Sequence, residues 1–323
     1  MKKVVAFALA VAALLWAAQA VPAADYPTRP VTLVLGFAPG GPSDVMARIF
    51  GKKLEQVIGQ AVVIENRAGA GGNVAAEMVV RAASDGYTLL LGNTGILAAN
   101  ISLFKKINYD PAKDFSPITL VGDQPNVIYV HPSMQAGSLA ELIALAKANP
   151  GKISYATGGH GTSPHLAGEL LKTEAKIEIV HVPYRGTGPA LQDVLAGHVQ
   201  MGISSIAPIG PHLQSGALRP LAVTGLKRTA LLPNIPTIAE LAIPGFEATA
   251  WHGLVAPAGT PKDVIATLYR AMMTTLNDPE VRKSLTDLGL DVAGSTPDEL
   301  AAYIKSEIPK WAAIVKASGA TLE

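Results

Sequence analysis

The segment from Gly36 to Asp44, GFAPGGPSD, places three glycines and two prolines directly after the apolar run Val31–Leu35. Glycine allows a ligand to approach the backbone closely, and proline in the first turn of a helix gives up an N–H group that the helix does not use. The remaining N–H groups point out of a helix N-terminus that carries about half a positive charge. The segment therefore predicts an anion site made of backbone amides.

Three further turns of the same kind occur along the chain. Each follows a short apolar run and precedes a helix-like pattern, and they span 69–73, 157–164 and 185–189. One such turn has a purely steric explanation, because tight connections use glycine anyway. Four turns in two separate regions favour ligand binding, since in open α/β sheets they lie at the carboxyl ends of the strands.

The type of anion follows from what these turns lack. No lysine follows the glycines in the phosphate-loop pattern, and a dinucleotide fingerprint placed on Gly69-Ala70-Gly71 misses its third glycine. A carboxylate fits better, because two to four N–H or O–H donors hold it without a metal or cofactor.

Catalysis and metal binding have weaker support. Ser163 lies near His160 and His165, but the nucleophile-elbow pattern is absent, and Ser163 before Pro164 is typical of a helix start. The seven histidines form no H-E-x-x-H motif and no close ligand pair on a helix. We therefore expect neither an enzyme nor a metal site, and we expect His252 to serve packing.

For the two charged residues in these turns, Asp44 and Arg185, the sequence leaves two possible roles open. Asp44 either stabilises the helix that it begins or contacts the ligand, by repelling a misplaced anion or bonding an amino or hydroxyl group. Arg185 either pairs at two points with a second carboxylate of the ligand or lies on the surface beside acidic groups.

The N-terminus has the three parts of a secretory signal peptide. Lys2 and Lys3 precede an uncharged Ala- and Leu-rich run, and small residues allow cleavage after Ala20 or Ala23. The alternative is an uncleaved membrane anchor. The chain has no cysteine, so we expect no disulfide and no lipid anchor, and a protein free in the periplasm. Losing both lysines changes the formal charge from +1 to −1, which gives no reason to expect nucleic acid.

Apolar periodicity predicts an α/β protein with parallel sheets flanked by helices, most simply divided into two domains. The predicted strands are Val31–Gly36, Ala61–Glu65, Thr88–Leu91, Ile153–Ala156, Ile177–Val182, Gln200–Ser204 and Leu218–Val223. The predicted helices are Asp44–Ile58, Leu139–Ala148, His165–Lys172, Ala190–Ala196, Lys262–Leu276, Pro279–Leu288 and Pro297–Ala317.

Together these stretches resemble the Bug family of periplasmic solute-binding proteins, the binding components of tripartite tricarboxylate transporters. The matching segments run in order through nearly the whole chain after the signal peptide: 26–30, 36–44, 65–73 (ENRAGAGGN), 85–89 (DGYTL), 183–190 (PYRGTGPA), 218–224 (LRPLAVT), 236–240 (PTIAE) and 251–260 (WHGLVAPAGT). Ala68 departs from the family, which commonly has proline there.

The resemblance implies a two-lobed type II-like binding protein whose cleft closes over a small carboxylate. The signal peptide would be residues 1–23, lobe 1 would hold 24–123 and 249–323, and lobe 2 would hold 124–248. The implied ligand contacts are Phe37, Ala38, Gly40, Gly41, Ser43, Asp44, Asn93, Thr94, Gly159, Gly161, Thr162, Ser163, Tyr184, Arg185, Gly186, Thr187 and Ser204.

The partners that the resemblance implies are a mono-, di- or tricarboxylate ligand and integral membrane permease subunits. The alternative is a carboxylate sensor of the same fold that reports to a membrane kinase. We expect a monomer, which is the default for this architecture.

Overall fold

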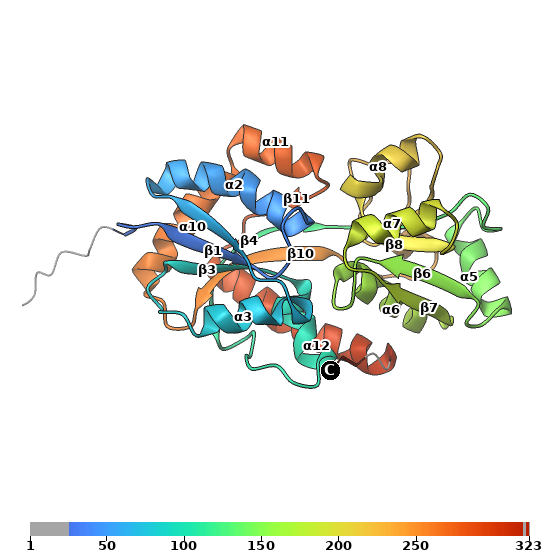
Figure 1. Cartoon of the computed structure of the whole chain (residues 1–323), viewed down its shortest axis with the longest axis horizontal. Coiled ribbons are helices and arrows are strands. Elements are labelled where there is room, and N and C mark those ends of the chain that lie inside the picture. The colour runs from blue at the N-terminus through green and yellow to red at the C-terminus, as the bar shows by residue number, and fades with distance from the viewer. Residues whose placement is uncertain (1–25, 319–320, 323) are drawn as a thin grey trace, which may run out of the picture.

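The structure is a computed structural model that describes residues 26–318 and 321–322. The predicted signal peptide lies outside the described residues. Two β-sheets lie side by side, each covered by helices (Figure 1). The α/β class with two lobes that the sequence predicted is confirmed.

The first sheet has the strand order β11-β4-β10-β3-β1-β2. Its core is parallel, because β1 pairs in parallel with both β2 and β3, whereas β10 runs antiparallel to β3 and β4. The bounds are β1 Val31–Leu35, β2 Val62–Asn66, β3 Thr88–Asn93, β4 Phe115–Gln124, β10 Ala250–Pro257 and β11 Asp291–Val292.

The second sheet has the order β7-β6-β8-β5-β9. Strand β6 pairs in parallel with β7 and β8, and β5 runs antiparallel to β8 and β9. The bounds are β5 Asn126–Val130, β6 Ile153–Thr157, β7 Ile179–Pro183, β8 Met201–Ser205 and β9 Arg219–Val223. The seven predicted strands form within one or two residues of the expected positions, but β4, β5, β10 and β11 were not predicted as strands.

Helices cover both sheets, and α2, α3, α6 and α7 begin directly after the four glycine-rich turns. On the first sheet these are α2 Pro42–Ile58, α3 Asn73–Val80, α4 Asn100–Leu103, α10 Lys262–Leu276, α11 Pro279–Asp287 and α12 Pro297–Ser318, with short helical turns η1 Ala70–Gly72 and η2 Gly95–Ala99. On the second sheet they are α5 Leu139–Ala148, α6 Ser163–Ala175, α7 Thr187–Leu195, α8 Ile206–Gln214 and α9 Ile238–Leu241.

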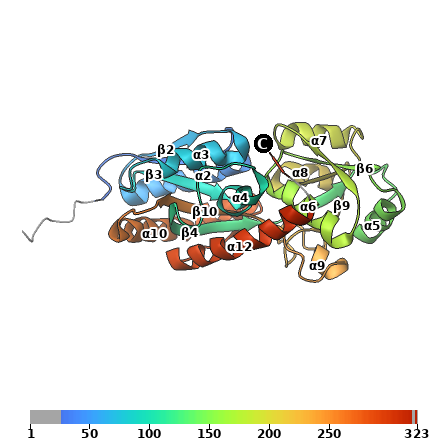
Figure 2. The ribbon, with the colours of Figure 1, turned by 90° about the horizontal axis from the view of Figure 1, so that it is seen from below.

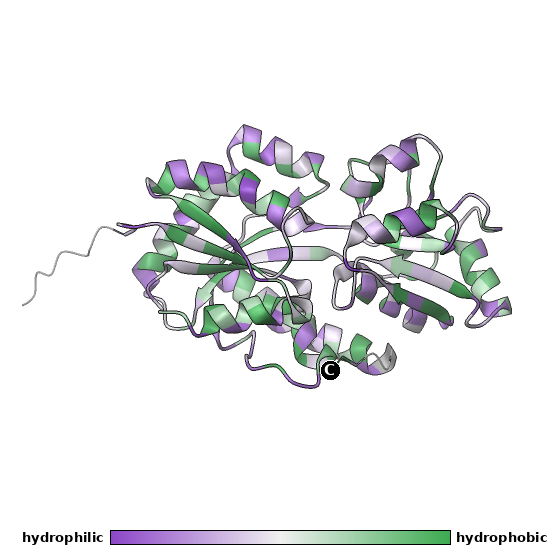
Figure 3. Cartoon of the chain, viewed as in Figure 1, coloured by the Kyte–Doolittle hydropathy of each residue, from purple (hydrophilic) through white to green (hydrophobic). Residues whose placement is uncertain are grey.

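Apolar residues concentrate on the strands and on the inner faces of the helices (Figure 3). Helices α2, α10 and α11 share one apolar core with β1, while α12 shares another with α6 of the second sheet. Figure 2 shows α12 running beneath the first sheet toward α6. Within the described part of the chain, every helix is too short or too polar to cross a membrane.

The chain passes between the sheets twice, at Pro125 and near Thr249, where Ala250 pairs with Gln124. These crossings lie where the resemblance implied the lobe boundaries. The exact division into 24–123 plus 249–323 and 124–248 stays a prediction.

Candidate functional site

The first turn runs from β1 into α2 and ends at Gly41, which caps the helix. Gly41 has an extended backbone, with φ −76° and ψ 169°, and α2 begins with proline and without a side-chain cap. The N–H groups of Asp44 and Val45 both donate to the Gly41 carbonyl at 3.0 Å, and Pro42 has no N–H, so Ser43 supplies the first N–H of α2 that is available to a ligand. Gly40 has φ +80°, a conformation that favours glycine.

Asp44 holds this turn together from within. Its Oδ2 accepts the Gly40 N–H at 3.0 Å, and Arg48 donates to both carboxylate oxygens at 2.9 and 3.0 Å. The hydrogen bond from Arg48 lowers the pKa of Asp44, which is 4% exposed. Of its two interpretations, these contacts support helix and turn stabilisation. The Gly40 N–H is therefore not available to a ligand. The side-chain amide of Asn66 donates to the Phe37 carbonyl at 2.9 Å, which holds the start of the turn in place.

Ser43 meets a histidine that lies 209 residues away in the sequence. Its Oγ is 3.1 Å from Nε2 of His252 on β10, and both side chains are buried. The Nδ1 atom of His252 is buried without a hydrogen-bond partner among the described residues. An orphaned buried N–H is rarer than an orphaned acceptor, so the proton belongs on Nε2. His252 then donates to Ser43, and the Ser43 hydroxyl proton is free to bind an anion.

The Ser43–His252 pair is a serine–histidine contact that sequence spacing did not reveal. Burial lowers the pKa of His252 to about 4, so the ring is neutral at pH 7. A catalytic triad also has a third group that orients the histidine through its other nitrogen, and no described residue forms a hydrogen bond with Nδ1 of His252.

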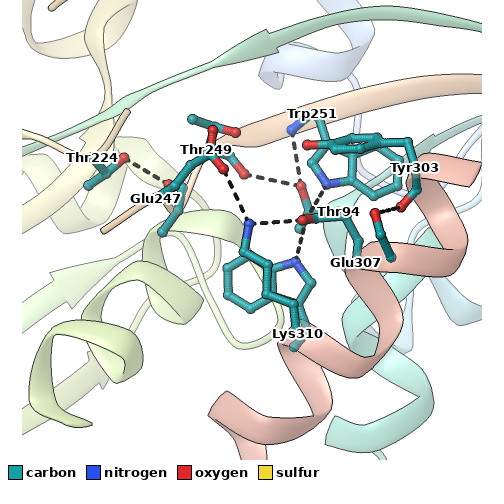
Figure 4. A network of polar contacts seen from close by, with 11 residues as sticks. Thr94, Thr224, Glu247, Thr249, Trp251, Tyr303, Glu307 and Lys310 are labelled. Atoms are coloured by element: carbon teal, nitrogen blue, oxygen red, sulfur yellow. Dashed lines mark hydrogen bonds and ion pairs between the residues drawn. The ribbon is translucent and has the colours of Figure 1, made fainter. Parts of the chain in front are cut away.

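Asn93 and Thr94 lie at the end of β3, next to β10. The Asn93 Oδ1 accepts the N–H of Ile96. The Thr94 hydroxyl donates to the Thr249 carbonyl at 3.2 Å and accepts the Trp251 N–H at 3.0 Å (Figure 4). Thr94 is 1% exposed, so the structure places it in the crossing between the sheets rather than at an exposed turn.

The β6–α6 turn is the counterpart on the second sheet. Helix α6 starts after Thr162, again without a side-chain cap and with proline in its first turn. The Thr162 hydroxyl donates to the Gly159 carbonyl at 2.7 Å, and Ser163 accepts from Asn126 at 2.7 Å. The side chains of Thr162 and Ser163 therefore shape the turn. The Gly159 N–H donates to the Thr157 hydroxyl and the Gly161 N–H donates to Nδ1 of His165, both at 3.3 Å. Gly161 is buried and has φ +71°.

The β7–α7 turn lies against the β6–α6 turn. The N–H of Tyr184 donates to the backbone carbonyl of Thr157 at 3.0 Å, and the N–H of Gly186 donates to the carbonyl of Gly158 at 3.1 Å. Neither N–H group is therefore free for a ligand. The Tyr184 hydroxyl donates to Asp193. Helix α7 begins at Thr187 without a side-chain cap.

Arg185 is exposed, and no ion pair joins it to any residue between 26 and 318. Of its two interpretations, surface pairing with acidic groups therefore has no support from the described side chains.

Ser204 lies on β8, is 2% exposed and donates to the Ser205 carbonyl at 3.1 Å.

The two sheets approach each other at two glycines. A Cβ atom on Gly95, in η2, would lie 2.7 Å from the carbonyl oxygen of Gly161. The buried Oδ1 of Asn100 lies beside both glycines and has no hydrogen-bond partner within the described chain. Thus the β6–α6 turn lies against the first lobe.

Two surface hollows lie elsewhere. One of about 540 Å³ runs between α2 and α11, and one of about 290 Å³ lies between α3 and Phe104. None of the predicted contact residues lines either hollow.

Replacing Gly41 with leucine tests the first turn. The backbone angles of Gly41 suit any residue, and a Cβ atom there makes an ordinary 3.4 Å contact with the Ala38 carbonyl, so the protein should fold. We expect carboxylate affinity to fall about tenfold or more, about 1.4 kcal/mol, because the side chain crowds the amides. Calorimetric titration measures this. Gly210→Leu, in open space on α8, is the control, and equal affinity of the two variants would contradict the prediction.

The model of the tripartite tricarboxylate transporter family receptors matches residues 46–320. Protein BugT of Bordetella pertussis is 38% identical over 304 residues, which cover 94% of this chain and 93% of that protein.

Solved structures agree. A structure from R. palustris with adipate has a TM-score of 0.84 and 37% identity, covering 92% of this chain and all of that chain. The structure of MatC from Rhodopseudomonas palustris with bound malate has a TM-score of 0.81 and 35% identity, covering 90% of this chain and all of that chain. The periplasmic binding protein BugD has a TM-score of 0.82. The resemblance inferred from the sequence is confirmed: the chain is a solute-binding protein that belongs to the tripartite tricarboxylate transporter receptor family.

Proposed function

We propose that this chain is a periplasmic receptor that captures a small carboxylate between its two lobes and delivers it to integral membrane permease subunits. The observation that carries the proposal is the set of uncapped N-termini of α2, α6 and α7, each beginning at a glycine-rich turn. Such termini favour negative charge and offer unpaired N–H donors. The adipate and malate in the similar structures support a carboxylate.

The hydrogen bonds within each turn separate the residues proposed to bind the ligand from those proposed to hold the backbone in place. On the first lobe, the N–H and the hydroxyl of Ser43 bind one carboxylate, while Asp44, Phe37 and Thr94 hold the backbone in place. This assignment follows from which donors are already occupied. Ala38 and Gly41 contribute through backbone that only small residues leave accessible.

On the second lobe, the N–H groups at the starts of α6 and α7 and the Arg185 guanidinium bind the other end of the ligand. Gly159, Gly161, Thr162, Gly186 and Thr187 provide the turn geometry. Because neither lobe encloses a ligand by itself, capture requires the lobes to close by hinge motion at the two crossings.

The location follows from the N-terminal pattern. We infer that residues 1–23 direct export and are removed, which leaves the receptor free in the periplasm. Mass spectrometry of the exported protein identifies cleavage after Ala20 or Ala23.

Thermal unfolding against a panel of mono-, di- and tricarboxylates tests the function. The chain without residues 1–23 is first stripped of bound ligand by unfolding and refolding. A ligand at a hundred times its Kd adds about 2.7 kcal/mol to the free energy of unfolding. We expect a rise of several degrees in Tm for one class of acid. No shift with any carboxylate would contradict the proposal.

A further inference from the structure

Three of the seven histidines come together on the second lobe. His160 lies in the β6–α6 turn, His165 lies in the first turn of α6, and His181 lies on β7. One ring nitrogen from each of the three lies within 4.8 Å of the other two. The ring centres are 5.4, 5.1 and 4.3 Å apart. Sequence spacing did not predict this triad, because His181 comes from a different strand.

We propose that His160, His165 and His181 form a site for a divalent first-row transition metal ion, with Zn²⁺ as the best fit, that keeps an open fourth position. Zinc binds imidazole nitrogens at about 2.0–2.1 Å, so three imidazoles around one tetrahedral ion have ring centres about 5 Å apart. The observed separations surround this value, and small rotations of the rings bring the three nitrogens to one ion. Imidazole ligands suit zinc, copper and nickel rather than calcium or magnesium.

The hydrogen bonds of two rings leave lone pairs for a metal. Nε2 of His181 lies 2.7 Å from the Thr157 hydroxyl, so Nδ1 is the nitrogen of that ring that can bind a metal. Such an outer hydrogen bond is what fixes a metal-binding histidine. Nδ1 of His165 accepts a long 3.3 Å contact from the Gly161 N–H, so it also carries a lone pair, and a metal ion can take the place of that contact.

The charged groups near the triad are already paired with each other. The nearby Glu169 carboxylate is paired with Lys172 at 2.8 Å, and Tyr155 donates to it at 2.7 Å.

The position of His160 connects this site to the surface. His160 is exposed and lies between Gly159 and Gly161, in one of the turns proposed to bind carboxylate. The open fourth position of the metal is therefore available to water or to a carboxylate oxygen. The metal site itself rests on the triad and does not depend on the proposed carboxylate function.

Calorimetric titration with Zn²⁺ tests the site. The chain without residues 1–23 is cleared of metal with a chelator and titrated with no carboxylate present. We expect one Zn²⁺ per chain, and we expect His160→Ala to weaken binding at least tenfold. His198→Ala is the control, because His198 is also an exposed histidine of this lobe but lies outside the triad. Absence of one-to-one binding, or equal affinity of the two variants, would overturn the proposal.

Thermal unfolding separates this proposal from the carboxylate function. We expect Zn²⁺ to raise the Tm of the wild type and of His198→Ala but not that of His160→Ala. Since His160 is exposed, its replacement should leave the unliganded Tm unchanged. A carboxylate shift in the presence of chelator, with no Zn²⁺ effect, would leave the receptor function intact and refute the metal site.

Discussion

Replacing Glu307 with leucine is expected to lower the free energy of unfolding by about 2–5 kcal/mol. Glu307 lies on α12, is 4% exposed, and its Oε2 accepts the indole N–H groups of Trp251 at 2.9 Å and Trp311 at 2.8 Å (Figure 4). Lys310 donates to its other oxygen at 2.8 Å. Both tryptophans are 0% exposed, so leucine would leave two buried N–H groups without a partner.

The matched variant is Glu307→Gln. Its amide oxygen can still accept both indole protons, and it loses mainly the ion pair with Lys310, whose side chain is 32% exposed. A partly exposed pair contributes about 0–1 kcal/mol, so glutamine should cost far less than leucine. Denaturant unfolding of both variants measures the difference. If the two lose the same stability, the indole hydrogen bonds are not the reason for the effect.

The same contacts matter for lobe motion. Trp251 is on β10, directly after the second crossing between the sheets, and Lys310 also lies 3.5 Å from Glu247 on the other side of that crossing. Helix α12 thus connects the crossing to the first lobe and packs on α6 of the second. The leucine variant should therefore also weaken ligand binding, because the crossing that must bend in a defined way is loosened.

Replacing Arg185 with alanine should weaken dicarboxylates about 10- to 150-fold and monocarboxylates much less. A charge-assisted hydrogen bond contributes about 1.5–3 kcal/mol, which is the origin of this range. The proposal places the second carboxylate of a diacid on the Arg185 guanidinium, whereas a monoacid is held by the α2 turn. Calorimetric titration with a matched pair of acids of the same chain length gives both affinities.

Arg228→Ala is the control for this prediction. Arg228 is an exposed arginine of the same lobe, but it pairs with Glu240 at 2.9 Å, away from the turns. Its replacement should leave both affinities unchanged, and neither arginine variant should change the Tm by more than a degree or two. Equal losses of monoacid and diacid affinity in Arg185→Ala would remove Arg185 from the site.

Local chemistry made much of this protein predictable. Helices Leu139–Ala148 and Lys262–Leu276 form with the predicted bounds. The predicted start of α12 at Pro297 is confirmed. Thr296 caps this helix: its Oγ1 accepts the Glu299 N–H at 3.2 Å, and Glu299 accepts the Thr296 N–H at 2.8 Å. Apolar periodicity and helix caps act over a few residues, so the sequence alone contains them. The glycine-rich turns are likewise local features that depend on a few neighbouring residues.

The sheets show where local patterns stop. Strands β4 and β10 run antiparallel, and this pairing depends on residues about 130 positions apart. Strand β5 is buried along its whole length, so it shows no alternation between buried and exposed faces that would have marked it.

At the site, the sequence by itself determined which turns present backbone N–H groups, and only the tertiary structure decided which of these groups are free. The Asp44 carboxylate accepts the Gly40 N–H, and the Gly158 carbonyl accepts the Gly186 N–H. The contact of Ser43 with His252 and the gathering of His160, His165 and His181 arise because the fold brings separate helices, turns and strands together. A hydrogen-bond partner or a shared ligand position is set by distance in space, and sequence spacing does not record that distance across elements.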